Sequence, residues 1–210
     1  MRTPIALAAV VAASLGGCGG PRPPALDYLP PSGNPAATPS VVVRQPSWLV
    51  WSSILDHLEQ RGVPVGDLDE AAGEMVVRYT GDPEPYVDCG WIVTYRKDEL
   101  ERTPAAAAVA TFQRRWHGKL VMVERDLELD ARMTVQVEPD GETAVVRTDS
   151  TYGLTKSVAP QAAEQPLHSE TIGFHSGESG TFSSGTVCQP TGALERLVLD
   201  ALPPLSFAGS

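Results

Sequence analysis

The sequence predicts an α+β fold in which a curved antiparallel sheet wraps a long helix, within a single domain over residues 41–204. A hairpin is the first sign: apolar and polar residues alternate over 121–137, PDGE at 139–142 supplies a turn, and a second alternating run follows over 143–158. Such alternation is typical of antiparallel strands with one buried face. Seventeen residues at about 3.3 Å each exceed the width of a small domain, so we expect the hairpin to bend around a helix.

One phase of each long strand is expected to face the core. In the first strand this phase holds Val121, Val123, Leu127, Leu129, Ala131, Met133, Val135 and Val137, and in the second it includes Ala144, Val146, Tyr152, Leu154 and Val158. The other phase of the first strand is largely charged, which leaves that face in water.

An amphipathic helix is expected at 47–61. Ser47 is placed as its N-cap, and Gly62 supplies the carboxyl-terminal stop. The apolar residues at helical spacing are Trp48, Trp51, Leu55 and Leu58. A tryptophan stripe on a helix is usually core, which is our interpretation, and a platform for a ligand is the alternative.

Shorter elements complete the predicted domain. Strands are expected at 64–69, 73–80 and 89–95. A closing helix is expected to begin at Pro190 and to end before Pro203, and it is the helix around which the hairpin is expected to bend. Its apolar stripe is Leu194, Leu197, Val198 and Ala201. A tail follows at 205–210.

An insertion at 97–118 has a helical pattern of its own. Thr103-Pro104 leads an alanine run that continues to Phe112 and Trp116. The one basic cluster of the chain lies at and just past its end and consists of Arg114, Arg115, His117 and Lys119. We interpret this cluster as a solvated helix end, and a surface for phosphate or an acidic partner is the alternative.

The amino terminus has the pattern of a secretion signal. Arg2 precedes an apolar run that is much shorter than the roughly 20 residues of a membrane-spanning helix, so residues 1–17 read as a signal peptide. Leu15-Gly16-Gly17-Cys18 looks like a bacterial lipobox, with acylation (palmitate among the chains) on Cys18. An ordinary secreted protein with a chance cysteine is the alternative. Gly19 after the cysteine favours the outer membrane, with the domain on the periplasmic face.

Residues 18–40 then form the lipidated cysteine and a linker rich in Pro, Gly, Ser and Ala. Such a composition predicts a disordered tether. A docking segment for a partner, anchored by Leu26, Tyr28 and Leu29, is the alternative.

Two cysteines remain, Cys89 and Cys188. An exported pair in an oxidising compartment is expected to form a disulfide, and this one would join an early strand to the start of the last helix. The spacings that mark a zinc site or a C-x-x-C redox pair do not occur around them.

The net charge and the absence of known motifs argue against several classes of function. Acidic residues outnumber basic ones by 26 to 16, for a net charge of -10, which argues against nucleic acid as a partner. The run GFHSGESGTFSSGT at 173–186 has neither a G-x-S-x-G elbow nor phosphate-loop spacing. We expect no catalytic residues, cofactor or metal, and therefore no enzyme.

The predicted features follow one another in a fixed order along the chain. The order is a lipobox, a loose linker, a helix opened by tryptophan, the motif GxxVGDLDxxxGEMVVRY at 62–79, long antiparallel strands and a closing helix. Together these features resemble the helix-grip domain of the BamC lipoproteins, accessory lipoproteins of the outer-membrane β-barrel assembly machine. The motif covers residues 46–80. The resemblance implies a helix-grip-like fold and a role in an envelope assembly, and it implies no catalytic residue.

We therefore expect a lipid-anchored accessory or scaffold subunit that binds other envelope proteins without catalysing a reaction. The alternative is a carrier of a lipid or another small apolar ligand in a cavity between sheet and helix. Candidate lining residues are Trp48, Trp51, Trp91 and Phe174, and Arg114 and Arg115 are a candidate surface for a partner.

Overall fold

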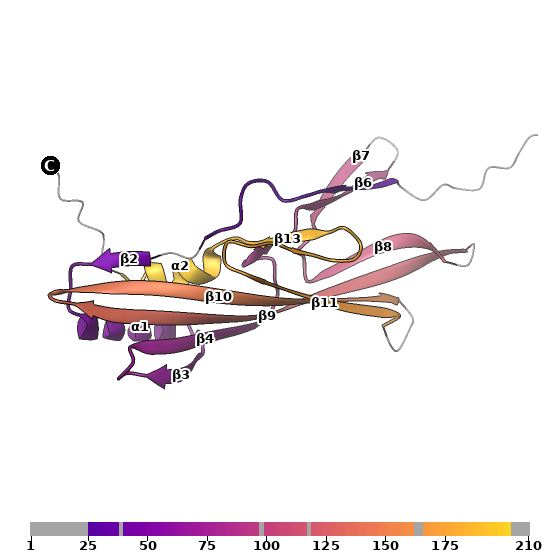
Figure 1. The fold of residues 1–210 in the computed structure, drawn as a ribbon. Helices are drawn as coiled ribbons and strands as arrows, with labels where there is room; N and C mark the ends of the chain where they lie inside the picture. Colours follow the sequence, from indigo (N-terminus) through magenta and orange to yellow (C-terminus); the bar gives the residue numbers. More distant parts are fainter. Residues whose placement is uncertain (1–24, 38–39, 97–98, 117–118, 162–165, 203–210) are drawn as a thin grey trace, which may run out of the picture.

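The computed structural model describes residues 25–37, 40–96, 99–116, 119–161 and 166–202. Within these ranges the protein is mostly β, with three antiparallel sheets and two short helices, α1 (Ser47–Gln60) and α2 (Ala193–Leu199) (Figure 1). The predicted α+β fold, in which a curved sheet wraps a long helix, is therefore wrong. Instead, α1 lies along part of a much longer hairpin (Figure 1).

That hairpin organises the largest sheet. Strand β9 (Lys119–Asp140) pairs with β10 (Thr143–Pro160) in one unbroken register, from Thr143 opposite Asp140 to Pro160 opposite Val123. Gly141 supplies a left-handed φ of 63° in the turn. The hairpin predicted from the alternation of apolar and polar residues is confirmed, and it is even longer than expected.

Each long strand pairs with two shorter strands placed end to end along its outer edge. On β9 these are β4 (Glu74–Gly81), opposite residues 129–136, and β8 (Val109–Trp116), opposite residues 119–126. On β10 they are β2 (Ser40–Val43), opposite residues 144–147, and β11 (His168–His175), opposite residues 151–158. Strand β3 (Val65–Asp69) pairs with β4. We call residues 129–154 the turn half of the hairpin, and residues 119–128 with 155–160 its open half.

Helix α1 covers only the turn half, because of its length. Its 14 residues rise about 21 Å, whereas the 22 residues of β9 extend roughly 70 Å. The buried residues of α1 are Val50, Trp51, Ile54 and Leu58, and they belong to one core with Leu129, Met133 and Val135 of β9. The closing helix around which the hairpin is expected to bend is α2, which has only 7 residues. Neither helix is therefore long enough for a hairpin of this length to wrap around it.

The tryptophan prediction is half correct. Trp51 is 9% exposed and belongs to the core, but Trp48 is 67% exposed. The buried stripe runs through Val50, Ile54 and Leu58, so Trp48 lies beyond its edge. Ser47 begins the helix without capping it, since Pro46 occupies the N-cap position.

The predicted alanine helix at 97–118 is also wrong. The described part of this insertion forms β7 (Glu99–Pro104), which pairs with β6 (Trp91–Arg96), and then β8. Ala105 and Ala106 lie in a buried turn between them. The Arg125 guanidinium donates to the carbonyl oxygens of Ala105 and Ala107, each at 2.6 Å. A tertiary donor therefore satisfies carbonyls that helical amides would otherwise bind.

The carboxyl-terminal helix is shorter than predicted. Pro190 ends strand β13 (Val187–Pro190), and α2 begins only at Ala193 after Gly192, whose φ is 74°. Pairing with β5 (Val87–Asp88) holds Gln189 and Pro190 in an extended conformation, and the Thr191 amide donates to the Tyr86 carbonyl at 3.0 Å. Pro190 is thus a strand residue and does not begin a helix.

Part of the predicted linker is folded onto the domain. Strand β1 (Ala25–Leu29) pairs with β6, Leu29 lying opposite Trp91. The Tyr28 hydroxyl donates to the Val187 carbonyl at 3.1 Å and accepts from the Val187 amide at 2.9 Å. The prediction of a disordered tether is therefore wrong for residues 25–37. The signal peptide and Cys18 lie outside the described residues, as does the tail at 205–210.

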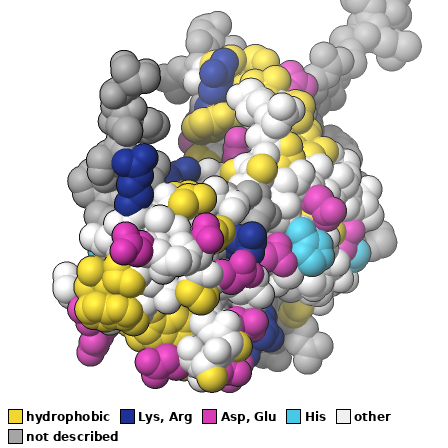
Figure 2. All heavy atoms as spheres, turned by 60° about the vertical axis from the view of Figure 1, so that its left-hand side comes forward, with side chains coloured by type: hydrophobic (Ala, Val, Ile, Leu, Met, Phe, Trp, Pro, Cys, Tyr) yellow, Lys and Arg dark blue, Asp and Glu magenta, His cyan; other side chains and the backbone are white. Residues whose placement is uncertain are grey.

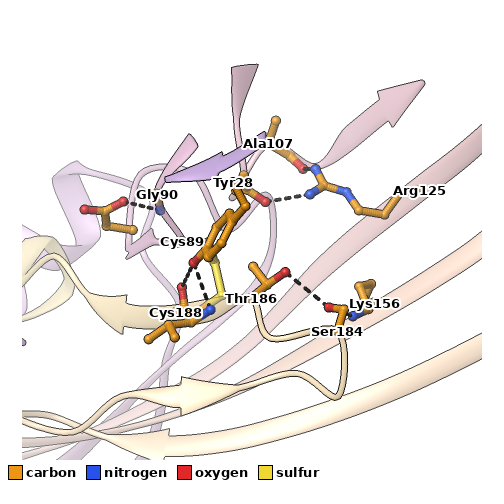
Figure 3. The surroundings of a disulfide bond; sticks show 12 residues. Tyr28, Cys89, Gly90, Ala107, Arg125, Lys156, Ser184, Thr186 and Cys188 are labelled. Atoms are coloured by element: carbon orange, nitrogen blue, oxygen red, sulfur yellow. Dashed lines mark hydrogen bonds between the residues drawn. A yellow bond between two sulfur atoms is a disulfide. The ribbon is translucent and has the colours of Figure 1, made fainter. Parts of the chain in front are cut away.

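The expected disulfide between Cys89 and Cys188 is present, and both cysteines are buried. It links the segment between β5 and β6 to β13, which forms a third sheet with β5 and β12 (Gly180–Thr181). Figure 3 shows Tyr28 of β1 beside this bridge. Because Cys188 lies in β13 and Cys89 directly follows β5, the disulfide lies next to the pairing of these two strands and does not reach the last helix, contrary to the prediction.

A buried carboxyl group supports the junction between the hairpin and α2. Glu195 is 2% exposed, and its Oε1 accepts from the Tyr152 hydroxyl at 2.9 Å and from the Ser176 hydroxyl at 2.8 Å. Burial and the neighbouring Glu195 raise the pKa of Tyr152, so its hydroxyl stays a donor. Tyr152 belongs to the core, and none of the three residues lines the cavity described next, so these bonds serve the packing of α2 on the hairpin.

Candidate functional site

The open half of the hairpin forms one wall of a cavity of about 480 Å³. This volume lies within the range of about 300–1,000 Å³ that is usual for ligand pockets. The lining residues are Ile92, Ala105, Phe112, Val121, Val123, Arg125, Leu127, Lys156, Val158, Pro160, Leu167, His168, Phe182, Ser183, Ser184 and Thr186. Most of these side chains are apolar, so the cavity is suited to an apolar ligand.

The cavity exists because the core ends before the hairpin does. In the turn half, α1 and α2 pack on the inward face of the sheet. In the open half the same inward phase continues through Leu127, Val123 and Val121, and it is covered by the loop at 182–186 and the buried alanine turn. A loop and a turn fill less volume than a helix, and the space between them and the sheet is left open.

Arg125 lies in the cavity wall on the inward phase of β9. It is 6% exposed, and its two terminal nitrogens donate to the carbonyl oxygens of Ala105 and Ala107. Figure 3 shows Arg125 beside Ala107. Within the described part of the chain, its Nε has no hydrogen-bond partner and no carboxylate forms an ion pair with it. Burial lowers the pKa of Arg125, which the Asp126 carboxylate opposes in part. An arginine remains charged under these conditions.

Lys156 lies on the inward phase of β10 and is 9% exposed. Its Nζ donates to the Ser184 hydroxyl at 3.0 Å, lies 3.4 Å from the nearer Glu170 oxygen, and stands 4.0 Å above the centre of the Phe182 ring. Burial lowers the pKa of Lys156, and Glu170 raises it. Figure 3 shows Lys156 beside Ser184 of the covering loop, so this cation ties the loop to the sheet.

Glu170 of β11 is the counter-charge of Lys156. It accepts from the Ser183 amide at 2.6 Å and from the Ser183 hydroxyl at 2.8 Å. The Ser183 amide, followed by the Ser183 hydroxyl and Lys156, lowers the pKa of Glu170 to about 2 against the opposing effect of desolvation. The carboxylate is therefore ionised throughout the neutral range.

The charges at the cavity do not balance. Among the described residues of the cavity, Lys156 is paired with Glu170 and Arg125 forms no ion pair, while the His168 side chain at the rim is more than half exposed. The chain as a whole has a net charge of -10. On the face drawn in Figure 2, the acidic side chains are dispersed among other residues and form no patch. The cavity is thus a locally cationic site in an acidic protein.

The tryptophans and Phe174 that the sequence suggested as lining do not contact this cavity. Trp48 and Trp51 border a separate hollow of about 130 Å³ near Glu70 and Gly73. Trp91 is 45% exposed on β6, and only its neighbour Ile92 reaches the cavity. Phe174 is buried against Tyr152, with ring centres 5.4 Å apart. None of these four side chains lines the cavity of about 480 Å³, and their role in binding a ligand stays a prediction.

Arg114 and Arg115 belong to β8, whose Phe112 lines the cavity. Their side chains, and the whole of His117, lie outside the part of the chain that the structure describes. The predicted surface for a partner at these arginines stays a prediction.

Sequence reasoning missed Arg125 and Lys156, although a signal was present. Arg125 stands between Val123 and Leu127 in the inward phase of its strand, and Lys156 stands between Leu154 and Val158 in the next one. A single charge in an otherwise apolar inward phase breaks the pattern of a strand with one buried face. Two such interruptions near one end of a hairpin indicate a polar site.

The described residues contain no group of three His, Cys, Asp or Glu side chains placed to hold a metal ion. None of the helices in the described ranges is long and apolar enough to cross a membrane. Comparison with protein-family models and with curated proteins finds no match. The resemblance to the BamC lipoproteins therefore rests on the sequence features of residues 46–80 and of the amino terminus.

Proposed function

We propose that this protein binds a small apolar or amphipathic ligand in the cavity of the open half, as an envelope lipoprotein anchored through Cys18. The observation that carries the proposal is the apolar lining of a cavity with the volume of a ligand site. Removing a chain from water in such a site contributes about 0.8 kcal/mol for each CH₂ group that is buried. Affinity is then expected to rise about fourfold with each added methylene until the cavity is full.

Filling the cavity provides a direct test of this function. Val121 is half-buried and lines the cavity, so Val121→Trp is expected to occupy the space and to weaken binding at least tenfold. The assay is the fluorescence of N-phenyl-1-naphthylamine, an apolar dye that brightens in a dry site, with the full chain carrying Cys18→Ser so that no detergent is needed.

Val145→Trp is the matched control. Val145 is another half-buried valine of the same hairpin, but it lies on the outward phase of β10 and outside the cavity lining. This variant is expected to bind the dye like the starting protein. Equal affinity in both tryptophan variants, or no dye binding in any of the three proteins, would count against the proposal.

A scaffold role is the second candidate, and one observation favours it. Large exposed apolar side chains lie on elements of the turn half: Val42 of β2, Trp48 of α1 and Leu68 of β3. Exposed tryptophan is enriched at sites where proteins meet. In this second role the protein would be an accessory subunit that holds an envelope assembly together through this end of the molecule.

Crosslinking in whole cells separates this second role from the first. With formaldehyde, the full chain is expected to yield crosslinked envelope proteins, and Trp48→Ala is expected to lose most of them. Trp91→Ala removes the exposed tryptophan of β6 and is expected to keep them. If the wild type is recovered as a monomer alone, the scaffold role is excluded.

A further inference from the structure

We infer that the ligand of the cavity is a single-chain amphiphile with an anionic head, held by Arg125 and Lys156. This inference rests on the proposed function and specifies the class of ligand. The geometry points to it because both cations belong to the cavity wall while apolar side chains line most of the space around them.

The positive charge of Arg125 is not paired with a carboxylate of the described residues. A buried cation is costly unless it is paired. Lys156 is paired with Glu170, but Arg125 has only the carbonyl oxygens of Ala105 and Ala107, and its Nε has no partner among the described residues. A ligand that brings one negative charge would complete this site, and a neutral or cationic ligand would leave the charge unpaired.

Arg125 and Lys156 lie near each other on the same face of the hairpin. Arg125 is opposite Val158 in the hairpin register, and Lys156 is opposite Leu127. The two residues are therefore diagonal neighbours on the same face, with a separation of roughly 7–8 Å between such positions. One carboxylate or phosphate between them can accept hydrogen bonds from both, and charge-assisted bonds of this kind are the strong ones.

The size and lining of the cavity define the rest of the ligand. Phe112, Val121, Val123 and Leu167 offer an apolar surface to a hydrocarbon chain. A volume of about 480 Å³ lies in the lower half of the range for small-molecule pockets, about 300–1,000 Å³, which favours one chain over two or three. The head group would lie at the cations and the chain would run along the apolar wall.

The test compares chains of equal length with different heads. Dodecanoate, dodecyl phosphate, dodecanol and dodecyltrimethylammonium each compete with N-phenyl-1-naphthylamine for the full Cys18→Ser chain at pH 8, below their micellar concentrations. We expect the two anions to bind at least tenfold more tightly than dodecanol and the cation to bind most weakly. A phosphate that outbinds the carboxylate, or the reverse, supports the anionic site and assigns the head group.

Variants test whether the cations cause this preference. Lys156→Met is expected to reduce the preference for dodecanoate over dodecanol to within about threefold, and Lys156→Arg to restore it. Glu170→Gln keeps an acceptor for Ser183 but removes the competing charge, so it is expected to strengthen the preference. Arg132→Met removes an exposed arginine from the outward phase of β9 and is expected to change nothing.

The possible failures are distinguishable. If dodecanol binds as tightly as dodecanoate, or if Lys156→Met and Glu170→Gln leave the preference unchanged, the inference of an anionic head is overturned while the apolar-ligand function stands. If none of the four chains displaces the dye, and the dye binds equally well to Val121→Trp, both are overturned.

Discussion

Replacing Cys89 and Cys188 together by serine is expected to lower the free energy of unfolding by about 4 kcal/mol. The disulfide closes a loop with a sequence separation of 99, and constraining a loop of that length in the unfolded chain is worth about 4.7 kcal/mol in the chain-entropy model. Removing a native disulfide from a small domain typically costs about 2–5 kcal/mol, and we expect a loss in the upper part of that range because the loop is long. Urea denaturation of the oxidised wild type and of the double variant, followed by circular dichroism, measures the difference.

Reduction supplies the control for this experiment. Adding a phosphine reductant to the unfolding reaction should bring the wild type close to the double variant and leave the double variant unchanged. A difference below about 1 kcal/mol between the two oxidised proteins would contradict the view that this bridge stabilises the domain.

Gly90→Ala is expected to cost about 3 kcal/mol and to release the amino-terminal strand. Gly90 has a φ of 75°, and an added Cβ would collide with the Leu29 carbonyl oxygen and lie 2.7 Å from the Pro30 carbonyl carbon. A left-handed conformation costs a residue with a side chain about 1–2 kcal/mol, and the collision with backbone adds to it. The segment at 25–31 would have to move away from β6 to relieve the contact.

Gly141→Ala is the matched control for this position. Gly141 also has a left-handed φ, 63°, but nothing lies within 4 Å of the place a Cβ would take. It should therefore lose only the conformational part, about 1 kcal/mol. Limited proteolysis completes the comparison: Gly90→Ala should be cut rapidly within residues 25–37, and Gly141→Ala should not. Equal losses and equal cleavage would mean that β1 is not held against the domain.

The local elements were largely predictable, because they depend on residues close in sequence. Strict alternation over 121–137 and 143–158 indicated the hairpin, and the strands now labelled β3, β4 and β6 lie close to their predicted ranges. Helix α1 begins and ends within a residue of its prediction, since Gly62 follows it with a φ of 65°. Each of these patterns has a period or a stop that can be read from one segment.

The architecture was not predictable in this way, because it depends on partners distant in sequence. Nothing within the alanine run shows that Arg125 will bind its carbonyl oxygens, and nothing within PPALDYLPP shows that Tyr28 will bind Val187. The predicted bend of the hairpin followed from its length alone. Its length instead accommodates two covers in succession, α1 over the turn half and a loop over the open half.

The candidate site was predictable in part, less than the local elements and more than the architecture. Arg125 and Lys156 interrupt the apolar phases of two strands that were predicted from the sequence. The inward direction of both side chains could therefore have been predicted as well. The tryptophans drew attention because of their size, and yet Trp48 is exposed and Trp51 is in the core. The covering loop and the counter-ion Glu170 required the pairing of β10 with β11, which brings Glu170 opposite Lys156.

The most direct test of ligand binding in the cavity is native mass spectrometry of the wild type and of Val121→Trp, each gently extracted from membranes and then supplied with dodecanoate. Our proposals predict a one-to-one adduct on the wild type, either a copurified single-chain anion or the added dodecanoate, and none on Val121→Trp. Both proteins at the mass of the chain alone would contradict ligand binding in this cavity.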